Sequence, residues 1–395
     1  MARRRRPLLL LFLTLVPSIA LFFACTASAY SKISDDTLHN LPSPGYDFDI
    51  HNGALLAPIL RTRVPGTSGS TAVLNHFANF FKTNLPDWII EYQNSSSTTP
   101  TSKGQEIPFV NFIAYRDPPW ADPGDVGRLT LVAHYDSKLT PEGFIGATDS
   151  AAPCAMIMHA ARSIDKALTK KWNAMKAEGA DVAFEEQKGI QILFLDGEEA
   201  FLSWTDADSL YGARSLAEHW DSRFHPALST YKTALNSISL FVLLDLLGEK
   251  SSYVPSYFTT THWAYQKMAE LEDRLRSLRL FKSSPNHGRD TATKEPLFLP
   301  DASKPPSAFM GFTVQDDHMP FMARGVEVLH LIPTPFPDVW HDMTDDGEHL
   351  DIPTVEDWAL LTTAFVGEWM DLDGFFDAAP YSEKKRWRPS GKTEL

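Results

Sequence analysis

An apolar run that ends in a cluster of acids is the feature that most constrains the fold of this chain. Residues 190–195 read Ile-Gln-Ile-Leu-Phe-Leu, which is typical of a strand buried on both faces of a parallel sheet. The run stops at Asp196-Gly197-Glu198-Glu199. Open α/β sheets build their sites at such strand ends. Adjacent glutamates on a turn point in different directions, so one can bind a metal while the other transfers protons.

Other apolar runs predict the rest of the sheet. Residues 128–133, 240–247 and 326–332 are nearly uninterrupted, and helical patterns separate them along the chain. Continuous apolar strands that alternate with helices indicate a parallel sheet covered on both faces. We therefore expect one α/β domain over residues 30–380, with a central, mostly parallel mixed sheet flanked by helices.

Several segments outside these patterns also carry expectations. Residues 88–92 read as a strand and the Ser/Thr run 95–102 as a loop. Residues 170–187 are charged and read as an exposed insertion, and residues 282–307 as a long irregular loop. Thr354 is expected to cap a helix, and the polar tail 381–395 to be disordered.

The N-terminus predicts targeting to the secretory pathway. Arg3–Arg6 is followed by an uncharged stretch, residues 7–29, that ends in the small-residue pattern Ala27-Ser28-Ala29. This is typical of a secretory signal over residues 1–29. An uncleaved anchor is the alternative and would be the protein's one contact with a membrane. Either places the folded part in the secretory lumen or outside the cell, where Asn94-Ser95-Ser96 is a glycosylation sequon. The net charge of −14 argues against a nucleic-acid partner.

Five potential metal ligands lie at or just beyond the predicted strand ends. A carboxylate inside an apolar run, such as Asp245, is costly to bury unless it is paired or binds a metal. A set of oxygen and nitrogen ligands without thiolates suits a catalytic zinc with an open position. The five are His134, Asp149, Glu199, Asp245 and His341.

Seven segments of the chain, between about Phe109 and Phe375, resemble animal-type glutaminyl-peptide cyclotransferases. That family shares its α/β fold with the zinc-dependent aminopeptidases, and the segments occur here in the family's order. They are HYDSK (134–138), FIGATDSAAPCA (144–155), FLDGEEAFLSW (194–204), DSLYGAR (208–214), LLDLLG (243–248), QDDHMPF (315–321) and GVEVLHLIPTPFPDVWH (325–341).

The resemblance implies one zinc ion per chain, bound by Asp149, Glu199 and His341, with Glu198 as the proton shuttle. Members of the family convert the N-terminal glutamine of peptides and proteins to pyroglutamate with release of ammonia. They act more slowly on N-terminal glutamate. Peptides that begin with either residue are the expected partners.

The resemblance also implies roles around the metal. Asp245 and Asp316 would form a hydrogen-bonded acidic pair. The substrate pocket would be lined by Trp204, Gln315, Phe336 and Trp340. The chain departs from mammalian members at Ala133, where they carry a cysteine that pairs with the one matching Cys154. That disulfide is therefore absent, and a buried thiol is expected at Cys154.

Two other functions fit parts of the sequence. In a two-zinc aminopeptidase, His134 and Asp245 would help to hold a second metal. A zinc-binding module without catalysis is a further alternative, although Glu198 and Asp316 are both present. The segments around Asp149, Trp204 and His341 favour the cyclotransferase.

Overall fold

The computed structural model describes residues 31–179, 187–250, 252–283, 297–309, 311 and 314–378. The predicted signal or anchor and the polar tail lie outside these residues. The chain divides into two compact units at Tyr30, and everything described here lies in the second. Within the described ranges, no helix combines the length and apolar character needed to cross a membrane.

Six strands form one sheet in the order β1-β2-β4-β3-β5-β6. β1 pairs antiparallel with β2, and β2 with β4, whereas β4, β3, β5 and β6 run parallel to one another. The predicted mixed, mostly parallel sheet is confirmed. The strands are β1 (Ile89–Thr98), β2 (Glu106–Arg116), β3 (Val126–His134), β4 (Gln187–Leu195), β5 (Ile238–Leu244) and β6 (Val328–Leu331).

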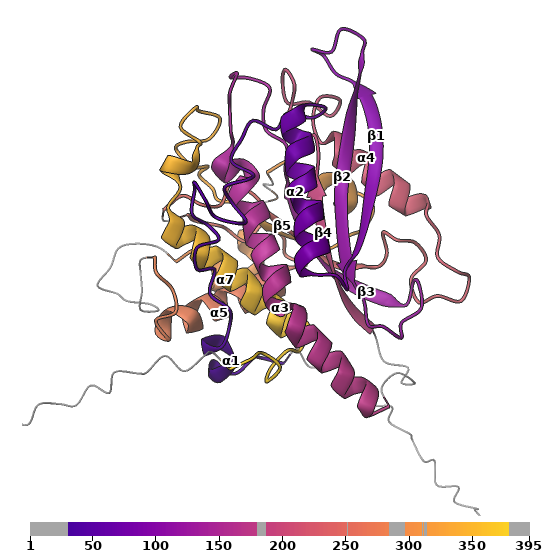
Figure 1. The fold of residues 1–395 in the computed structure, drawn as a ribbon, viewed down its shortest axis with the longest axis vertical. Helices are drawn as coiled ribbons and strands as arrows, with labels where there is room; N and C mark the ends of the chain where they lie inside the picture. The colour runs from indigo at the N-terminus through magenta and orange to yellow at the C-terminus, as the bar shows by residue number, and fades with distance from the viewer. Residues whose placement is uncertain are drawn as a thin grey trace, which may run out of the picture. The chain divides into compact units, whose positions relative to one another are not determined.

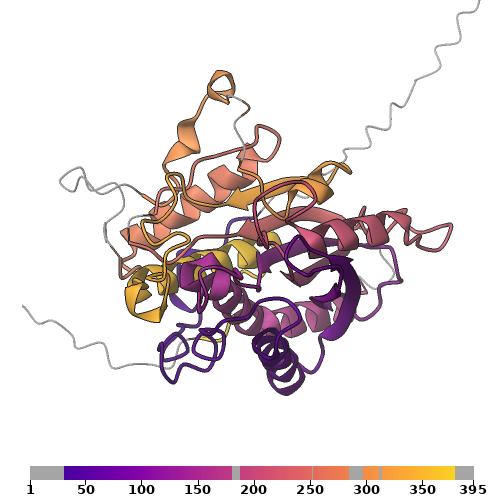
Figure 2. The ribbon, with the colours of Figure 1, turned by 90° about the horizontal axis from the view of Figure 1, so that it is seen from above.

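Helices cover both faces of this sheet. α2, α3, α5 and α7 pack on one face, and α4 and α6 on the other; α2 and α4 are seen on opposite sides in Figures 1 and 2. The helices are α1 (Asp35–His39), α2 (Ser68–Asn84), α3 (Ala152–Ala177), α4 (Tyr211–Ser222), α5 (His262–Ser277), α6 (Met319–Met322) and α7 (Ile352–Trp369), with short turns η1 (Ala147–Ala151), η3 (Pro300–Ser303), η4 (Pro306–Ala308) and η5 (Gly347–His349).

Strand β4 shows why the central strands read as continuous apolar runs. Successive side chains of a strand point to opposite faces. Ile192 and Phe194 contribute to the core under α2 and α3, whereas Leu193 and Leu195 pack beneath α4. Burying each such side chain contributes about 1.5–3 kcal/mol. Because both faces are covered, both sets of positions are mainly apolar, and the buried Gln191 is paired with Thr130.

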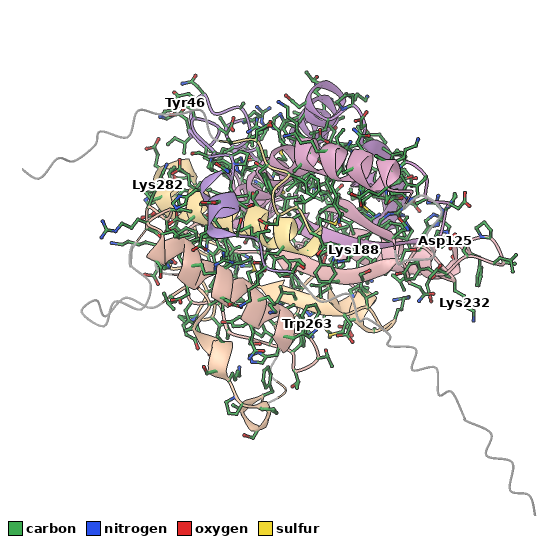
Figure 3. The ribbon with its side chains drawn as sticks, turned by 90° about the horizontal axis from the view of Figure 1, so that it is seen from below. Tyr46, Asp125, Lys188, Lys232, Trp263 and Lys282 are labelled. Carbon is green, nitrogen blue, oxygen red and sulfur yellow. The ribbon has the colours of Figure 1, made fainter. Side chains whose placement is uncertain are left out.

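The parallel strands bring the predicted site residues to one edge. His134 ends β3 opposite Leu195 of β4, and Asp245 follows β5 directly. Figure 3 views the molecule from below and labels Asp125 and Lys188, which lie where β3 and β4 begin. The acidic turn after β4 lies at the other end of these strands, as predicted.

Two predictions about local structure are wrong. β1 continues to Thr98, so residues 95–98 of the predicted loop are strand, and Asn94 is an exposed strand residue opposite Val110. The run Ser95-Ser96-Ser97-Thr98 is tolerated here because the strand lies at the edge of the sheet, where exposed and partly buried positions alternate. The supposed insertion begins as helix, since α3 continues to Ala177 and buries Trp172. Residues 180–186 lie outside the described residues.

The C-terminal helix and the 282–307 loop also differ from the predictions. Asp351, not Thr354, caps α7, because its side chain accepts a hydrogen bond from the Thr354 N–H at 2.9 Å. Helices favour a short side chain with a hydrogen-bond acceptor at this position. Within the described part of the loop, η3 and η4 add short helical turns.

Cys154 is free and fully buried, as expected.

Candidate active site

The turn after β4 is held by a buried aspartate. Asp136 is fully buried, and its two carboxylate oxygens accept hydrogen bonds from the backbone N–H groups of Glu198 (3.1 Å) and Glu199 (3.2 Å). Gly197 permits this turn, since it has φ +73° and a Cβ there would lie 2.4 Å from Phe109 Cδ1. The role of Asp136 was not predicted, although it lies within the HYDSK segment.

Asp149, Glu199 and His341 converge in space. Their ligand atoms all lie within 4.8 Å of one another. His341 Nε2 is 3.5 Å from Asp149 Oδ2 and 3.6 Å from Glu199 Oε1. The three residues come from the turn before α3, the turn after β4 and the loop after β6, so only the fold brings them together.

The hydrogen bonding of this cluster fits a metal ion. The other oxygen of each carboxylate has a partner, because Asp149 Oδ1 faces His134 Nε2 at 3.0 Å and Glu199 Oε2 accepts from Lys138 Nζ at 3.2 Å. Asp149 Oδ2 and Glu199 Oε1 are buried without a hydrogen-bond partner among the described residues. Two buried, unpaired oxygens beside an imidazole nitrogen are costly unless a cation lies between them. The donor set suits zinc.

The turn that carries Asp149 is braced from two distant segments. Arg63, fully buried, donates hydrogen bonds to the carbonyl oxygens of Ile145, Gly146 (2.8 Å) and Asp149 (3.1 Å). Asp345 Oδ1 accepts from the N–H and the hydroxyl of Thr148 at 2.7 and 2.9 Å. Neither residue carries a signal in the sequence.

His134 and Asp245 form a second possible metal cluster with Asp149. Its atoms already have partners, unlike those of the first cluster. His134 Nε2 lies 3.0 Å from Asp149 Oδ1, and Asp245 Oδ1 accepts from the Ser150 hydroxyl and from the Leu246 N–H. The hydrogen bonding therefore favours a metal at the first cluster over one at the second.

Glu198 is placed for proton transfer. Only 6% of the residue is exposed, and it lines the same cavity as the three converging residues. Burial raises the pKa of Glu198 well above its usual range, and the charges of Glu199 and Asp316 add to this although His134 opposes them. A carboxyl group with a raised pKa can hold or release a proton near neutral pH, as a general acid and base must.

The predicted acidic pair lies beside this group. Burial, followed by the charge of Asp316, raises the pKa of Asp245. Within the described ranges no hydrogen bond joins the two carboxylates, and Asp316 Oδ2 instead accepts from His330 Nε2 at 2.7 Å. His330 was not predicted as a site residue, since it is one histidine within a buried strand.

A cavity of about 500 Å³ opens over the cluster. The predicted lining residues Trp204, Gln315, Phe336 and Trp340 all line it. Trp340 stacks on His341 with ring centroids 3.9 Å apart and meets Phe336 edge to face at 4.8 Å. Trp204 Nε1 donates to Gln315 Oε1 at 2.8 Å. Aromatic walls over a polar floor suit a small side chain with a polar end.

The fold and this cluster together define a metal-dependent α/β enzyme. The sequence pattern of peptidase family M28 matches residues 120–366. The chain is 37% identical over 327 residues to the glutaminyl-peptide cyclotransferase of Gloydius blomhoffii, with 80% of each chain covered. It is 36% identical over 321 residues to that of Bos taurus, with 80% of this chain and 81% of the relative covered.

A solved structure agrees. Glutaminyl cyclase from Macrostomum lignano superimposes with a TM-score of 0.69 and 26% identity, over 88% of this chain and 97% of that one. The chain therefore belongs to peptidase family M28 and, within it, to the glutaminyl-peptide cyclotransferases.

Proposed function

We propose that this chain is a zinc-dependent glutaminyl-peptide cyclotransferase that converts the N-terminal glutamine of peptides and proteins to pyroglutamate. N-terminal glutamate is the slower substrate. The observation that carries the proposal is the convergence of Asp149, Glu199 and His341 beside buried Glu198, under an aromatic cavity. One zinc per chain, held by these three residues, accounts for the two unpaired carboxylate oxygens.

The residues around the cluster suit this chemistry. Zinc, when bound, supplies Lewis-acid polarisation of the γ-carbonyl group. As the bond between the α-nitrogen and the γ-carbon forms, Glu198 accepts a proton from the α-amine. It returns that proton to the amide nitrogen as the C–N bond breaks, so the leaving group departs as ammonia. The nucleophile is tethered to its target, so Trp204, Phe336 and Trp340 contribute by fixing the geometry and excluding water.

An aminopeptidase with two metals is the second candidate. It is motivated by the spacing of His134, Asp149 and Asp245. Measuring metal content per chain, together with release of free amino acids from a peptide, distinguishes the two functions.

We infer that the chain acts in the secretory lumen or outside the cell, as a secreted or an anchored protein. The basic and apolar N-terminus supports this location. Asn94 is exposed at the edge of the sheet, which suits it as a glycosylation acceptor. Cleavage is tested by N-terminal sequencing of the protein secreted from a eukaryotic host.

The decisive test uses purified protein and a peptide that begins with glutamine, with and without a metal chelator. We expect each peptide to lose the mass of one ammonia, as measured by mass spectrometry, and we expect the chelator to prevent this loss. The same peptide with an acetylated N-terminus is the control, because its nitrogen cannot attack. Cyclisation that persists after complete metal removal, or release of free glutamine, contradicts the proposal.

A further inference from the structure

A second cavity of about 440 Å³ adjoins the first. Trp204 and Gln315 line both cavities, and their 2.8 Å hydrogen bond forms the partition between them. The second cavity lies over the start of α4 and the region of α6, outside the metal cluster. Its remaining lining residues are Asp206, Ser209, Leu210, Arg214, Glu218, Met319, Pro320 and Arg324.

The partition is held in place before any substrate arrives. Asp208, 3% exposed, accepts hydrogen bonds from the N–H groups of Phe201 (3.0 Å), Leu202 (2.9 Å) and Ser203 (3.0 Å). Its Oδ1 also accepts from the Tyr211 hydroxyl at 2.8 Å. The segment that leads to Trp204 is therefore tied to the start of α4, and a ligand that crosses the partition meets a preformed surface.

Of the two arginines that line this cavity, Arg214 makes the weaker contacts with the rest of the protein. Its guanidinium lies over the Tyr211 ring at 5.1 Å and donates only at 3.4 Å, to the carbonyl oxygens of Leu210 and Ala207. No carboxylate lies within 4 Å of it in the part of the chain that the structure describes. Arg324, in contrast, lies 3.7 Å from Asp221. A carboxylate that enters the cavity would find in Arg214 a planar, forked donor.

The reach of a peptide connects the two cavities. An extended peptide advances about 3.3 Å per residue. If its first residue lies at the metal cluster, the residues after the second therefore extend beyond the first cavity. We propose that the second cavity binds residues three and four of the substrate peptide, and that Arg214 there binds a carboxylate. The carboxylate comes from an acidic side chain or from the C-terminus of a short peptide. Asp206 and Glu218 line the same cavity, so one carboxylate is favoured over several. This inference rests on the proposed function.

The test compares kcat/KM for amidated Gln-Ala-Glu-Ala and Gln-Ala-Gln-Ala, and for Gln-Ala-Ala with a free and an amidated C-terminus. Amidated Gln-Ala is the reference. We expect the parent enzyme to prefer the glutamate peptide about three- to tenfold over its neutral partner, as for a partly exposed charge-assisted contact. Arg214→Gln should reduce this preference to less than about twofold, and Arg214→Lys should retain part of it. A preference confined to the free C-terminus would identify that source of the carboxylate.

Arg223→Gln is the matched control, since it removes a positive charge at the end of the same helix. Arg223 pairs with Glu91 at 3.2 Å and lines a different cavity, so this variant should keep the parent's preference. Equal kcat/KM for charged and neutral peptides in the parent overturns the inference, as does a preference that Arg214→Gln leaves intact. Failure of the proposed function looks different, because amidated Gln-Ala itself would not be cyclised.

Discussion

Replacing Arg63 with methionine tests whether the N-terminal arm holds the metal site in shape. The side chain is fully buried and serves three carbonyl groups of the turn that carries Asp149. Methionine is of similar length and flexible, so the change removes the charge and the donors without opening a large cavity.

The expected cost follows from these contacts. The Gly146 carbonyl keeps a donor, the Ala151 N–H at 3.2 Å. The carbonyls of Ile145 and Asp149 lose theirs, and each such loss costs about 1–3 kcal/mol, or roughly 2–6 kcal/mol for the two. Burial lowers the pKa of Arg63, so its desolvation opposes folding, and removing the guanidinium returns part of the loss. Because the groups left behind are neutral carbonyls, we expect a net cost of about 2–5 kcal/mol after this return. We expect Arg63→Met to lower the free energy of unfolding by that amount and to weaken zinc binding about 10–100-fold, as for lost support of a metal ligand.

Two measurements check this expectation. Denaturant unfolding of the metal-free protein isolates the contribution of the contacts from that of bound metal. Competition with a chromophoric chelator reports the zinc affinity. Arg61→Met is the control, because Arg61 is exposed and lies two residues away in the same arm. A variant within about 1 kcal/mol of the parent, with unchanged zinc affinity, would refute the reasoning.

Three further predictions concern the turn after β4 and the pH dependence of stability. Glu198→Gln should retain zinc but lose about 10²–10⁴-fold in kcat, and near-parent turnover would exclude Glu198 as the proton shuttle. Asp136→Asn should lower kcat/KM about 10–100-fold, because its amide group turns a donor toward the N–H of Glu198 or Glu199; unchanged kinetics would contradict that bracing role. Burial lowers the pKa of His159 from 6.5 to about 4. The unfolded state therefore binds the proton first, and stability is lost as pH falls below about 6.5. Between pH 7.5 and pH 5 this histidine should lower the free energy of unfolding by about 2 kcal/mol, and His159→Gln should not show this part of the loss. Equal losses of stability in both proteins would refute this role of His159.

The sequence by itself determined the fold class and the main site residues. Parallel strands covered on both faces are apolar at most positions, so residues 190–195, polar only at Gln191, could be recognised as a buried strand without any knowledge of their partners. Connections between parallel strands place the carboxyl ends at one edge. For this reason His134, Asp149, Glu199, Asp245 and His341 could be listed as candidate ligands at or beyond the strand ends. The resemblance of the surrounding segments then selected Asp149, Glu199 and His341 as the zinc ligands.

Only the tertiary structure decided how these residues are supported. Arg63 meets the Asp149 turn across more than eighty positions of sequence, and Asp345 meets it across nearly two hundred. The helical and strand periodicity of a sequence carries no information about such long-range contacts. The partition between the two cavities likewise depends on Trp204 meeting Gln315, 111 residues apart. Local sequence patterns predict which side chains are buried, whereas the hydrogen-bond partners of buried polar groups depend on how distant segments pack.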